Sequence, residues 1–471
     1  MNSKIKKITK DFSYTVIANL LSIIISTVLI LIVPRFVNVV EYGYWQLYLF
    51  YVSYISYMSF GITDGALLRY GGQEYKVIPK KIFVSQFWLL IILNIIIYSL
   101  IIYFYSILVT DTNKELIIFL TCMGGLLIVP RSLITFILQA TGRIKEYSKI
   151  LIIEKVVYFI LVILLLLFGM HSFLNLVFAD LIGKLVSIVY SILIARELVI
   201  GKFETFRISF NETIINMKVG SKVLFANLSS MFIIGIVRFG IEYRWGVETF
   251  GKVSLTLSIC NMLLLFLNGV SVVLFPTLRK MSINKLPILY NSIRSFMTIP
   301  ILGLLIIIYP LREFLLIWLT EYEDSINYMI ILFPMCIYES ITIMLINTYL
   351  KTLRKEKAML IINLITVLIS LIITIINIFV LSNFNLAILS ILLLLIFRSI
   401  VGEVYLTKVM NIKIRKDFIY ELILTTIFII ANCYLDKYFG IIIYIIFYLM
   451  YLIIKRSDLK KLLTYIKFRG Q

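Results

Sequence analysis

The chain has 471 residues, 61% of them hydrophobic, and a mean hydropathy of +1.02. No soluble fold buries that much apolar surface, so the composition excludes a soluble protein and predicts an integral membrane protein. The formal net charge of +20 would indicate nucleic-acid binding in a soluble protein. In a membrane protein this charge is typical of basic cytoplasmic loops, and we expect no nucleic-acid partner.

The apolar stretches are about 20 residues long and lack the short alternation that is typical of a membrane β-barrel. They predict an all-α membrane protein with about 14 transmembrane helices. The predicted spans are 12–34, 44–62, 83–108, 115–138, 149–168, 173–195, 219–241, 250–275, 291–310, 326–350, 358–381, 384–407, 418–435 and 438–454.

Lysine and arginine set the predicted orientation. The N-terminus, the even-numbered loops and the C-terminus carry 34 of the 45 basic residues, whereas the odd-numbered loops carry five. Because basic loops stay on the cytoplasmic side, both termini should be cytoplasmic, in a multi-pass protein of the plasma (inner) membrane. The tail beyond Lys455 fits either a short basic helix on the inner leaflet or a merely basic tail.

An internal repeat organises the chain. Residues 17–61 overlay without gaps on the segment that lies 208 residues further along, with ten identities in 45 positions. Polar matches such as Asn19 with Asn227 carry the signal, because leucine and isoleucine matches are common in so apolar a chain. A second overlay, of 141–143 on 352–354, has an offset of 211 residues. Together they predict two six-helix repeats in the same orientation, followed by two further helices.

The repeat divides the chain into four parts, with a polar and basic stretch as the natural connection between the two copies. The predicted parts are an N-terminal six-helix lobe (1–200), a cytoplasmic linker (201–217), a C-terminal six-helix lobe (218–410), and two last helices with a basic cytoplasmic tail (411–471).

Basic residues inside the predicted spans outnumber the acidic ones, which favours an anionic cargo in a cationic cleft between the lobes. A phosphate or pyrophosphate suits such a site, because arginine grips it bidentately and lysine binds it as a point charge. The predicted head-group contacts are Arg131, Lys184 and Arg398, with Arg238 and Lys252 at the outer mouth. For the last two and for Lys184, ion pairs with nearby acidic residues are the alternative.

Acidic residues inside the spans are candidates for coupling to a proton or sodium ion. Glu339 lies near the centre of its predicted helix with no basic residue three or four positions away, so it must be protonated, bind a cation, or pair across helices. Arg398 is a candidate partner. Asp180 is a second candidate for coupling, with an internal pair to Lys184 as the alternative. Asn19 and Asn227 either hydrogen-bond between helices or face the cavity.

The sequence predicts no cofactor and no metal site. It lacks a glycine-rich loop that ends in Lys-Ser/Thr, so nucleotide hydrolysis by a P-loop is not expected. His171 is the only histidine, and the four cysteines lack the paired spacing of a metal site.

Two stretches carry a resemblance to a known family. Glu41-Tyr42-Gly43-Tyr44-Trp45-Gln46-Leu47 and Gly61-Ile62-Thr63-Asp64-Gly65-Ala66-Leu67-Leu68-Arg69-Tyr70-Gly71-Gly72, with the predicted layout, resemble Wzx-type polysaccharide flippases of the multidrug/oligosaccharidyl-lipid/polysaccharide exporter superfamily. The resemblance implies a flippase for undecaprenyl-pyrophosphate-linked oligosaccharide repeat units that works by alternating access. It also implies capsule, O-antigen or exopolysaccharide assembly, with membrane lipids and the polysaccharide assembly machinery as partners. By resemblance, Asp64 and Arg69 belong to a cytoplasmic-end motif that either locks a loop or contacts cargo.

Two other functions compete with this interpretation. A drug or cation antiporter of the same superfamily should have an acidic cavity. A membrane-embedded polysaccharide polymerase or ligase should have a sizeable external loop, and the longest predicted one, 311–325, is short. We therefore expect a transporter rather than an enzyme.

Overall fold

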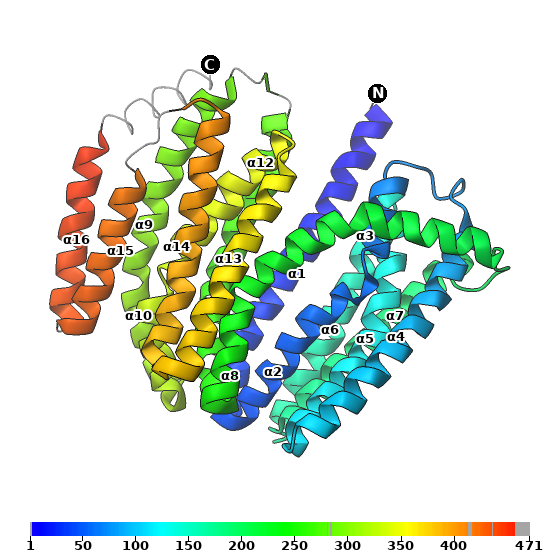
Figure 1. Ribbon diagram of the computed structural model, residues 1–471, viewed down its shortest axis with the longest axis horizontal. Coiled ribbons are helices and arrows are strands. Elements are labelled where there is room, and N and C mark those ends of the chain that lie inside the picture. The colour runs from blue at the N-terminus through cyan, green and yellow to red at the C-terminus, as the bar shows by residue number, and fades with distance from the viewer. Residues whose placement is uncertain (1, 280, 283–284, 413–416, 436, 457–471) are drawn as a thin grey trace. The chain divides into compact units, whose positions relative to one another are not determined.

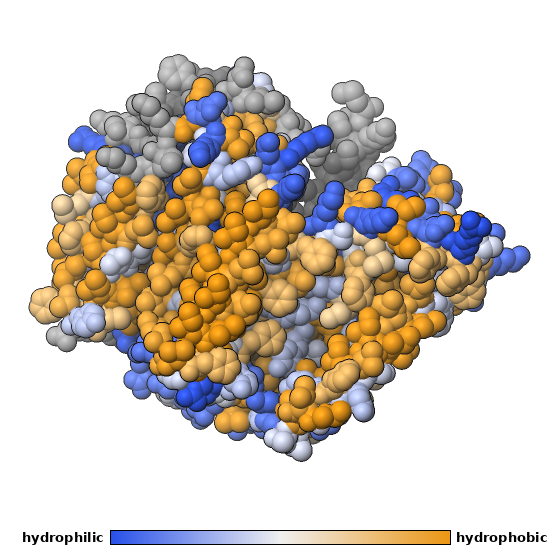
Figure 2. All heavy atoms as spheres, viewed as in Figure 1, coloured by the Kyte–Doolittle hydropathy of each residue, from blue (hydrophilic) through white to orange (hydrophobic). Residues whose placement is uncertain are grey.

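The computed structural model describes residues 2–279, 281–282, 285–412, 417–435 and 437–456, and within them the regular elements are all helices. This confirms the predicted all-helical class. The basic tail predicted after Lys455 lies, from residue 457 onward, outside the described residues. Ten helices are long and apolar enough to span a membrane, or eleven if one bent pair forms a single span. On the face drawn in Figure 2, hydrophobic side chains cover the middle of the helices and hydrophilic ones gather near their ends.

The chain divides into two compact units, Met1–Leu228 and Ser229–Gln471 (Figure 1). The boundary falls inside the longest helix, α8 (Phe206–Arg279). Most of the predicted linker, 201–217, is helical, because α8 begins at Phe206. The physical reason is a polar stripe at helical spacing, since Ser209, Thr213 and Asn216 are all buried on one side of α8.

The N-terminal unit is built around α5, which contacts α2, α3, α4, α6 and α7. Most of α5 is buried in this unit, and its buried residues combine leucine and isoleucine with small and polar residues such as Gly124, Gly125 and Arg131. The helices of this unit that precede α8 are α1 (Asn2–Phe36), α2 (Val39–Ile55), α3 (Ile62–Tyr70), α4 (Lys80–Leu108), α5 (Thr112–Ala140), α6 (Ile144–Leu167) and α7 (Phe173–Ile194).

Backbone touches backbone where α3 crosses the start of α8. A Cβ added to Gly65 would lie 2.0 Å from the carbonyl oxygen of Asn216, and one added to Gly220 would lie 2.0 Å from that of Gly61. Gly61 also has a φ of 81°, a conformation that favours glycine. Only glycine permits this approach, so the glycines in the second resemblance stretch hold α3 against α8.

The C-terminal unit repeats the pattern of long helices and adds a broken one. α10 and α11 are separated at Pro334, and the two halves of this span, 320–332 and 335–352, meet at 55°. A π-helical segment, Ile341–Asn347, follows α11. The helices of this unit after α8 are α9 (Leu286–Trp318), α10 (Glu323–Leu332), α11 (Met335–Ser340), α12 (Thr348–Thr352), α13 (Glu356–Ile376), α14 (Phe384–Val409), α15 (Asp417–Tyr434) and α16 (Lys437–Ile454).

The chain breaks at matching places in the two units. Asn38, with an extended backbone, caps α2 just after α1 ends. Its counterpart at the 208-residue offset is Gly246, whose φ of 82° interrupts α8. Gly246 therefore divides α8 into two helical arms, which correspond to two of the predicted spans, 219–241 and 250–275. The predicted external loop 311–325 is mostly helical, because α9 continues to Trp318.

Candidate functional site

A buried polar layer in the N-terminal unit joins α5, α6 and α7. Arg131, on α5, forms an ion pair with Glu154 on α6. The same guanidinium donates to Ser187 Oγ on α7 at 2.9 Å. The Arg131 and Glu154 side chains are 10% and 11% exposed. A guanidinium at this depth thus has its charge matched within the unit, and we call these three residues the Arg131 layer.

A second pair lies close by on α7. Lys184 forms an ion pair with Asp180, one turn earlier. The Tyr48 hydroxyl of α2 donates to Asp180 Oδ2 at 2.7 Å and accepts from Lys184 Nζ at 3.2 Å. The structure thus shows the internal pair that the sequence allowed as an alternative. A head-group role for Lys184 and a coupling role for Asp180 stay predictions.

The C-terminal unit contains a comparable layer around Arg398 on α14. Its Nη1 lies 3.2 and 3.3 Å from the carboxylate oxygens of Glu339 on α11. Nε donates to Asn363 Oδ1 on α13 at 3.0 Å, and Nη2 donates to Ser230 Oγ on α8 at 2.9 Å. The cross-helix pairing of Glu339 with Arg398 follows the sequence expectation. We call these four residues the Arg398 layer.

The two layers occupy equivalent places in the repeat. Arg131 and Glu339 differ by 208 positions, and Glu154 and Asn363 by 209. Ser187 and Arg398 differ by 211 positions, so all three offsets agree to within one helical turn. The arginine, however, sits on the first helix of the trio in one unit and on the last helix in the other.

The local backbone around Glu339 is irregular. Pro334 ends the preceding helix segment and the π-helix begins two residues after Glu339. Such π-helical segments inside a helix frequently occur at functional sites, because they place backbone and side chains out of the regular register. The Glu339 side chain is 15% exposed while Arg398 is 3% exposed. The carboxylate is therefore the more accessible member of this pair.

The two cations predicted at the outer mouth lie on either side of the break at Gly246. Arg238 donates to Ser254 Oγ at 2.8 Å and stacks over the Phe250 ring. Lys252 lies 2.9 Å from both Glu248 and Asp324. Lys252 thus has two acidic neighbours, one on α8 and one on α10.

The predicted polar pair Asn19 and Asn227 occupies exposed positions on α1 and α8. Neither is part of the layers, although Ser230, one turn beyond Asn227, belongs to the Arg398 layer. Their cavity role stays a prediction.

The two charged residues of the resemblance stretch have separate surroundings. Arg69 donates to Asn216 Oδ1 at 2.6 Å and to Glu212 Oε2 at 2.8 Å, both on α8. Asp64 lies in the first turn of α3, where burial raises the pKa of its carboxyl above the ordinary value. Arg69 therefore reinforces the glycine crossing between α3 and α8.

Sequence reasoning missed a cluster in the C-terminal unit. Arg294 on α9 binds Glu403 on α14 and Glu421 on α15, and all three are buried. Asp417 pairs with Lys455 nearby. These residues lie within a few turns of helix ends, so the sequence places them at the membrane surface. The only signal was their charge within an otherwise apolar run.

These additions change the charge count. Among the buried residues that the structure describes, five are basic and five are acidic. The surplus of buried positive charge expected from the sequence is therefore not found among them. The physical reason is that each buried lysine or arginine forms an ion pair with an acidic residue, and some of these acidic residues lie near helix ends in the sequence.

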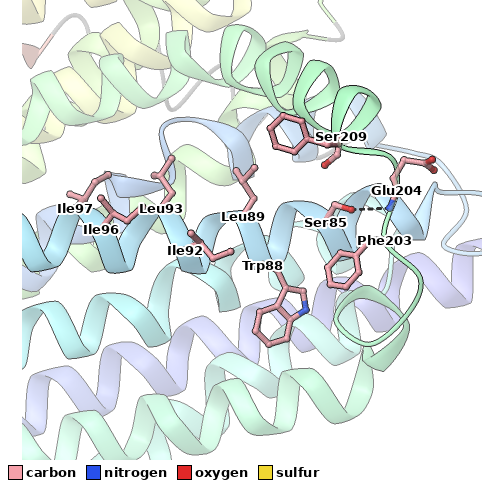
Figure 3. Close-up of a pocket in the computed structure, with 11 residues that line it drawn as sticks. Ser85, Trp88, Leu89, Ile92, Leu93, Ile96, Ile97, Phe203, Glu204 and Ser209 are labelled. Atoms are coloured by element: carbon pink, nitrogen blue, oxygen red, sulfur yellow. Dashed lines mark hydrogen bonds between the residues drawn. The ribbon is translucent and has the colours of Figure 1, made fainter.

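An apolar groove runs along α4 in the N-terminal unit (Figure 3). It has a volume of about 630 Å³ and lies between one face of α4 and the stretch that leads into α8. At its polar end the Glu204 backbone N–H donates to Ser85 Oγ at 3.0 Å. Trp88, Ile92 and Ile96 supply exposed apolar surface along its length. The lining suits a lipid chain better than a polar ligand.

The all-helical fold, with a buried polar layer in each unit, has counterparts among solved structures of membrane transporters. No family model and no curated protein sequence matches the chain. Among solved structures, the inward-facing form of a multidrug resistance MATE family transporter of the MOP superfamily aligns with a TM-score of 0.63. The two are 13% identical, and the alignment covers 83% of this chain and 98% of the other.

The lipid II flippase MurJ, in an inward closed conformation, aligns with a TM-score of 0.66 and 16% identity, over 95% of this chain and 99% of its own. The outward-facing form of a MATE family transporter of the MOP superfamily gives a TM-score of 0.54 and 13% identity, over 85% and 96%. The chain is therefore a multi-pass membrane protein with the fold of MOP superfamily transporters. Its structural neighbours are transporters and flippases.

Proposed function

We propose that the protein is a flippase that moves a polyprenyl-pyrophosphate-linked oligosaccharide across the plasma membrane by alternating access. The observation that supports this best is that the equivalent layer of each unit contains a buried arginine, Arg131 or Arg398, paired with a glutamate. A drug carrier for organic cations has no need of such a residue, whereas a pyrophosphate head group does.

The ion pairs supply a way to hold arginine while the carrier is empty. An arginine cannot lose its proton, so an unpaired one at this depth would be strongly disfavoured. A pyrophosphate presents the same kind of oxygens as a carboxylate and can take its place on the guanidinium. Cargo binding then becomes an exchange of one anion for another, without exposing a bare charge.

Exchange at the Arg398 layer also supplies a coupling step. Once the cargo occupies Arg398, the carboxylate of Glu339 loses its counter-charge. A carboxylate in that position is neutralised most simply by a proton. Glu339 is more exposed than Arg398 and so is placed to take it up. Proton uptake at Glu339 would then accompany loading of the anionic cargo.

The remaining predicted residues fit around this scheme. Lys184, Arg238 and Lys252 would assist the head group along its path, and Asp180 would be a second coupling site. The polyprenyl tail would stay in lipid while the sugars cross. The proposed setting is polysaccharide assembly at the inner membrane, with both termini cytoplasmic.

The test uses purified protein in vesicles that contain a polyprenyl-pyrophosphate-linked disaccharide. A membrane-impermeant enzyme that trims the sugar reports how much cargo has reached the outer leaflet. We expect Arg398→Ala and Arg131→Ala to abolish translocation while the protein stays folded. Because removing an arginine leaves a glutamate unpaired, the double variant Arg398→Ala/Glu339→Gln separates loss of function from loss of fold.

Lys351→Gln is the matched control, since this exposed lysine lies outside the layers and should leave translocation unchanged. Full translocation by both alanine variants would overturn the proposal. Transport of organic cations that depends on Glu339, with no transport of the lipid-linked sugar, would support the antiporter instead.

A further inference from the structure

The proposed function does not use the cluster around Arg294. In this cluster one guanidinium forms ion pairs with two carboxylates. Arg294 Nε and Nη2 lie 2.8 and 2.9 Å from the two oxygens of Glu403. Nη2 is also 2.9 Å from Glu421 Oε2, and Nη1 pairs with Glu421 Oε1. Arg294 is 1% exposed. We call these three residues the Arg294 clamp.

The described surroundings do not supply the missing positive charge. Among the described residues, Arg294, Glu403 and Asp417 are charged neighbours of Glu421. Asp417 has its own partner in Lys455. The other titratable groups packed around the clamp are Tyr290, Tyr338 and Tyr451, which are neutral at physiological pH. With both glutamates ionised, the described charges of this region sum to minus one at a site without water access.

The hydrogen bonds of Thr298 point to where a neutralising proton sits. Its hydroxyl donates to the Arg294 carbonyl oxygen at 2.8 Å and accepts from Arg294 Nη1 at 2.6 Å. Its oxygen is also 3.3 Å from Glu421 Oε1. A threonine hydroxyl has one proton, so it can donate either to the Arg294 carbonyl or to Glu421. When it donates to the nearer carbonyl, the contact with Glu421 becomes a hydrogen bond if Glu421 is the donor.

We propose that the Arg294 clamp is a proton-binding site, with the proton held on Glu421 and donated to Thr298. A metal ion is a poorer occupant, because all four carboxylate oxygens already face guanidinium donors. The Tyr290 hydroxyl also donates to Glu403 Oε1 at 3.0 Å, which keeps Glu403 the ionised partner of the pair.

The bound proton has a structural consequence. Glu421 lies on α15, which packs against α9, α10 and α16, and Tyr444 of α16 donates a hydrogen bond to the Leu302 carbonyl of α9. With the proton bound, the clamp is neutral. When the pH rises and the proton leaves, the excess negative charge opposes the attachment of α15. This inference rests on the clamp alone and holds whatever the cargo is.

The experiment is infrared difference spectroscopy of the full-length protein in lipid, titrated from acid to alkaline pH. A protonated carboxyl group has a carbonyl stretch distinct from that of a carboxylate. We expect the wild type to show this band at neutral pH and to lose it as the pH rises. Glu421→Gln removes the protonated group, and Glu403→Gln leaves one arginine with one ionised glutamate, so both variants should lose the neutral-pH band.

Glu356→Gln is the control, because this exposed glutamate lies outside the clamp and the two layers, and the neutral-pH band should remain. Thermal unfolding gives a second readout. The wild type should lose stability as the pH rises through the neutral range, whereas Glu421→Gln, which mimics the protonated state, should not. A wild type without the band at neutral pH, or a band that survives in both glutamine variants, would overturn the proposal. The wild-type spectrum alone can do so if a variant fails to fold.

Discussion

Arginine is the residue whose burial demands most from its surroundings in this protein. It stays charged in any protein environment and offers five donors, so each buried copy needs acceptors on several sides. Arg131 finds a carboxylate and a hydroxyl on two neighbouring helices. Arg398 finds a carboxylate, an amide and a hydroxyl on three. These partners convert a costly charge into a contact that fixes helix against helix.

Breaking the pair in the Arg131 layer should be more harmful than deleting it. Glu154→Gln leaves the guanidinium uncompensated and should lower the free energy of unfolding by about 3–5 kcal/mol. The double variant Arg131→Gln/Glu154→Gln should recover much of that loss, because no charge remains buried. Chemical denaturation in mixed micelles measures both. Equal destabilisation of the single and double variants would contradict the pairing.

Asp64 gives a pH-dependent prediction at the cytoplasmic end. Burial raises the pKa of its carboxyl in the folded state, so the folded protein holds the proton more tightly than the unfolded chain does. Its contribution to stability is fully present below the ordinary carboxyl pKa and is lost as the pH rises through the raised value. In the Asp64→Asn variant the melting temperature should therefore change less with pH in the acidic range. A variant whose melting temperature depends on pH as the wild type's does would show that Asp64 does not titrate this way.

At the scale of elements, the contact between α3 and α8 explains the glycines of the second resemblance stretch. Side chains are absent from the crossing, and the two backbones meet directly. Arg69 then ties the same two helices through Glu212 and Asn216. The stretch therefore has a packing role that is independent of any cargo contact. α8 continues without interruption from this crossing into the C-terminal unit.

Gly65→Ala should disrupt this crossing. The new methyl group would lie 2.0 Å from the Asn216 carbonyl oxygen, and a backbone atom cannot move aside as a side chain can. We expect a loss of at least about 1–3 kcal/mol, the range typical of overpacking, measured as a fall in the melting temperature of the purified protein. Gly201→Ala is the control, since its added Cβ meets only the Val84 side chain at 3.5 Å. Equal effects of the two substitutions would argue against the crossing.

At the scale of the whole molecule, each unit has its own core and its own buried layer. The asymmetry of basic residues predicts that the connection at 201–205 faces the cytoplasm and that residues 319–322 face the opposite side. Alkaline phosphatase fused after Leu319 should be active, and the same enzyme fused after Gly201 should be inactive. Activity after Gly201 would reverse the assigned orientation.

The sequence predicts the helical class, because that depends on long apolar runs, and it offers Arg398 as one candidate partner of Glu339 among three alternatives for this carboxylate. It does not predict the Arg294 clamp, since nothing in three separate stretches shows that their ends converge. The sequence also gives no signal for the π-helix after Glu339, because it consists of ordinary helix-forming residues. The only signal in the sequence for a partner of Arg131 is that Glu154 lies within a predicted span.

The relocation of the arginine between the two layers bears on how the duplicated halves diverged. If both descend from one ancestral half, a positive charge left one helix and reappeared on another while the depth of the layer stayed the same. Moving one member of a buried pair alone would have stranded its partner. Divergence must then have passed through an uncharged ancestor or through paired changes, and either history keeps the polar layer at the same place in the repeat while its individual side chains change.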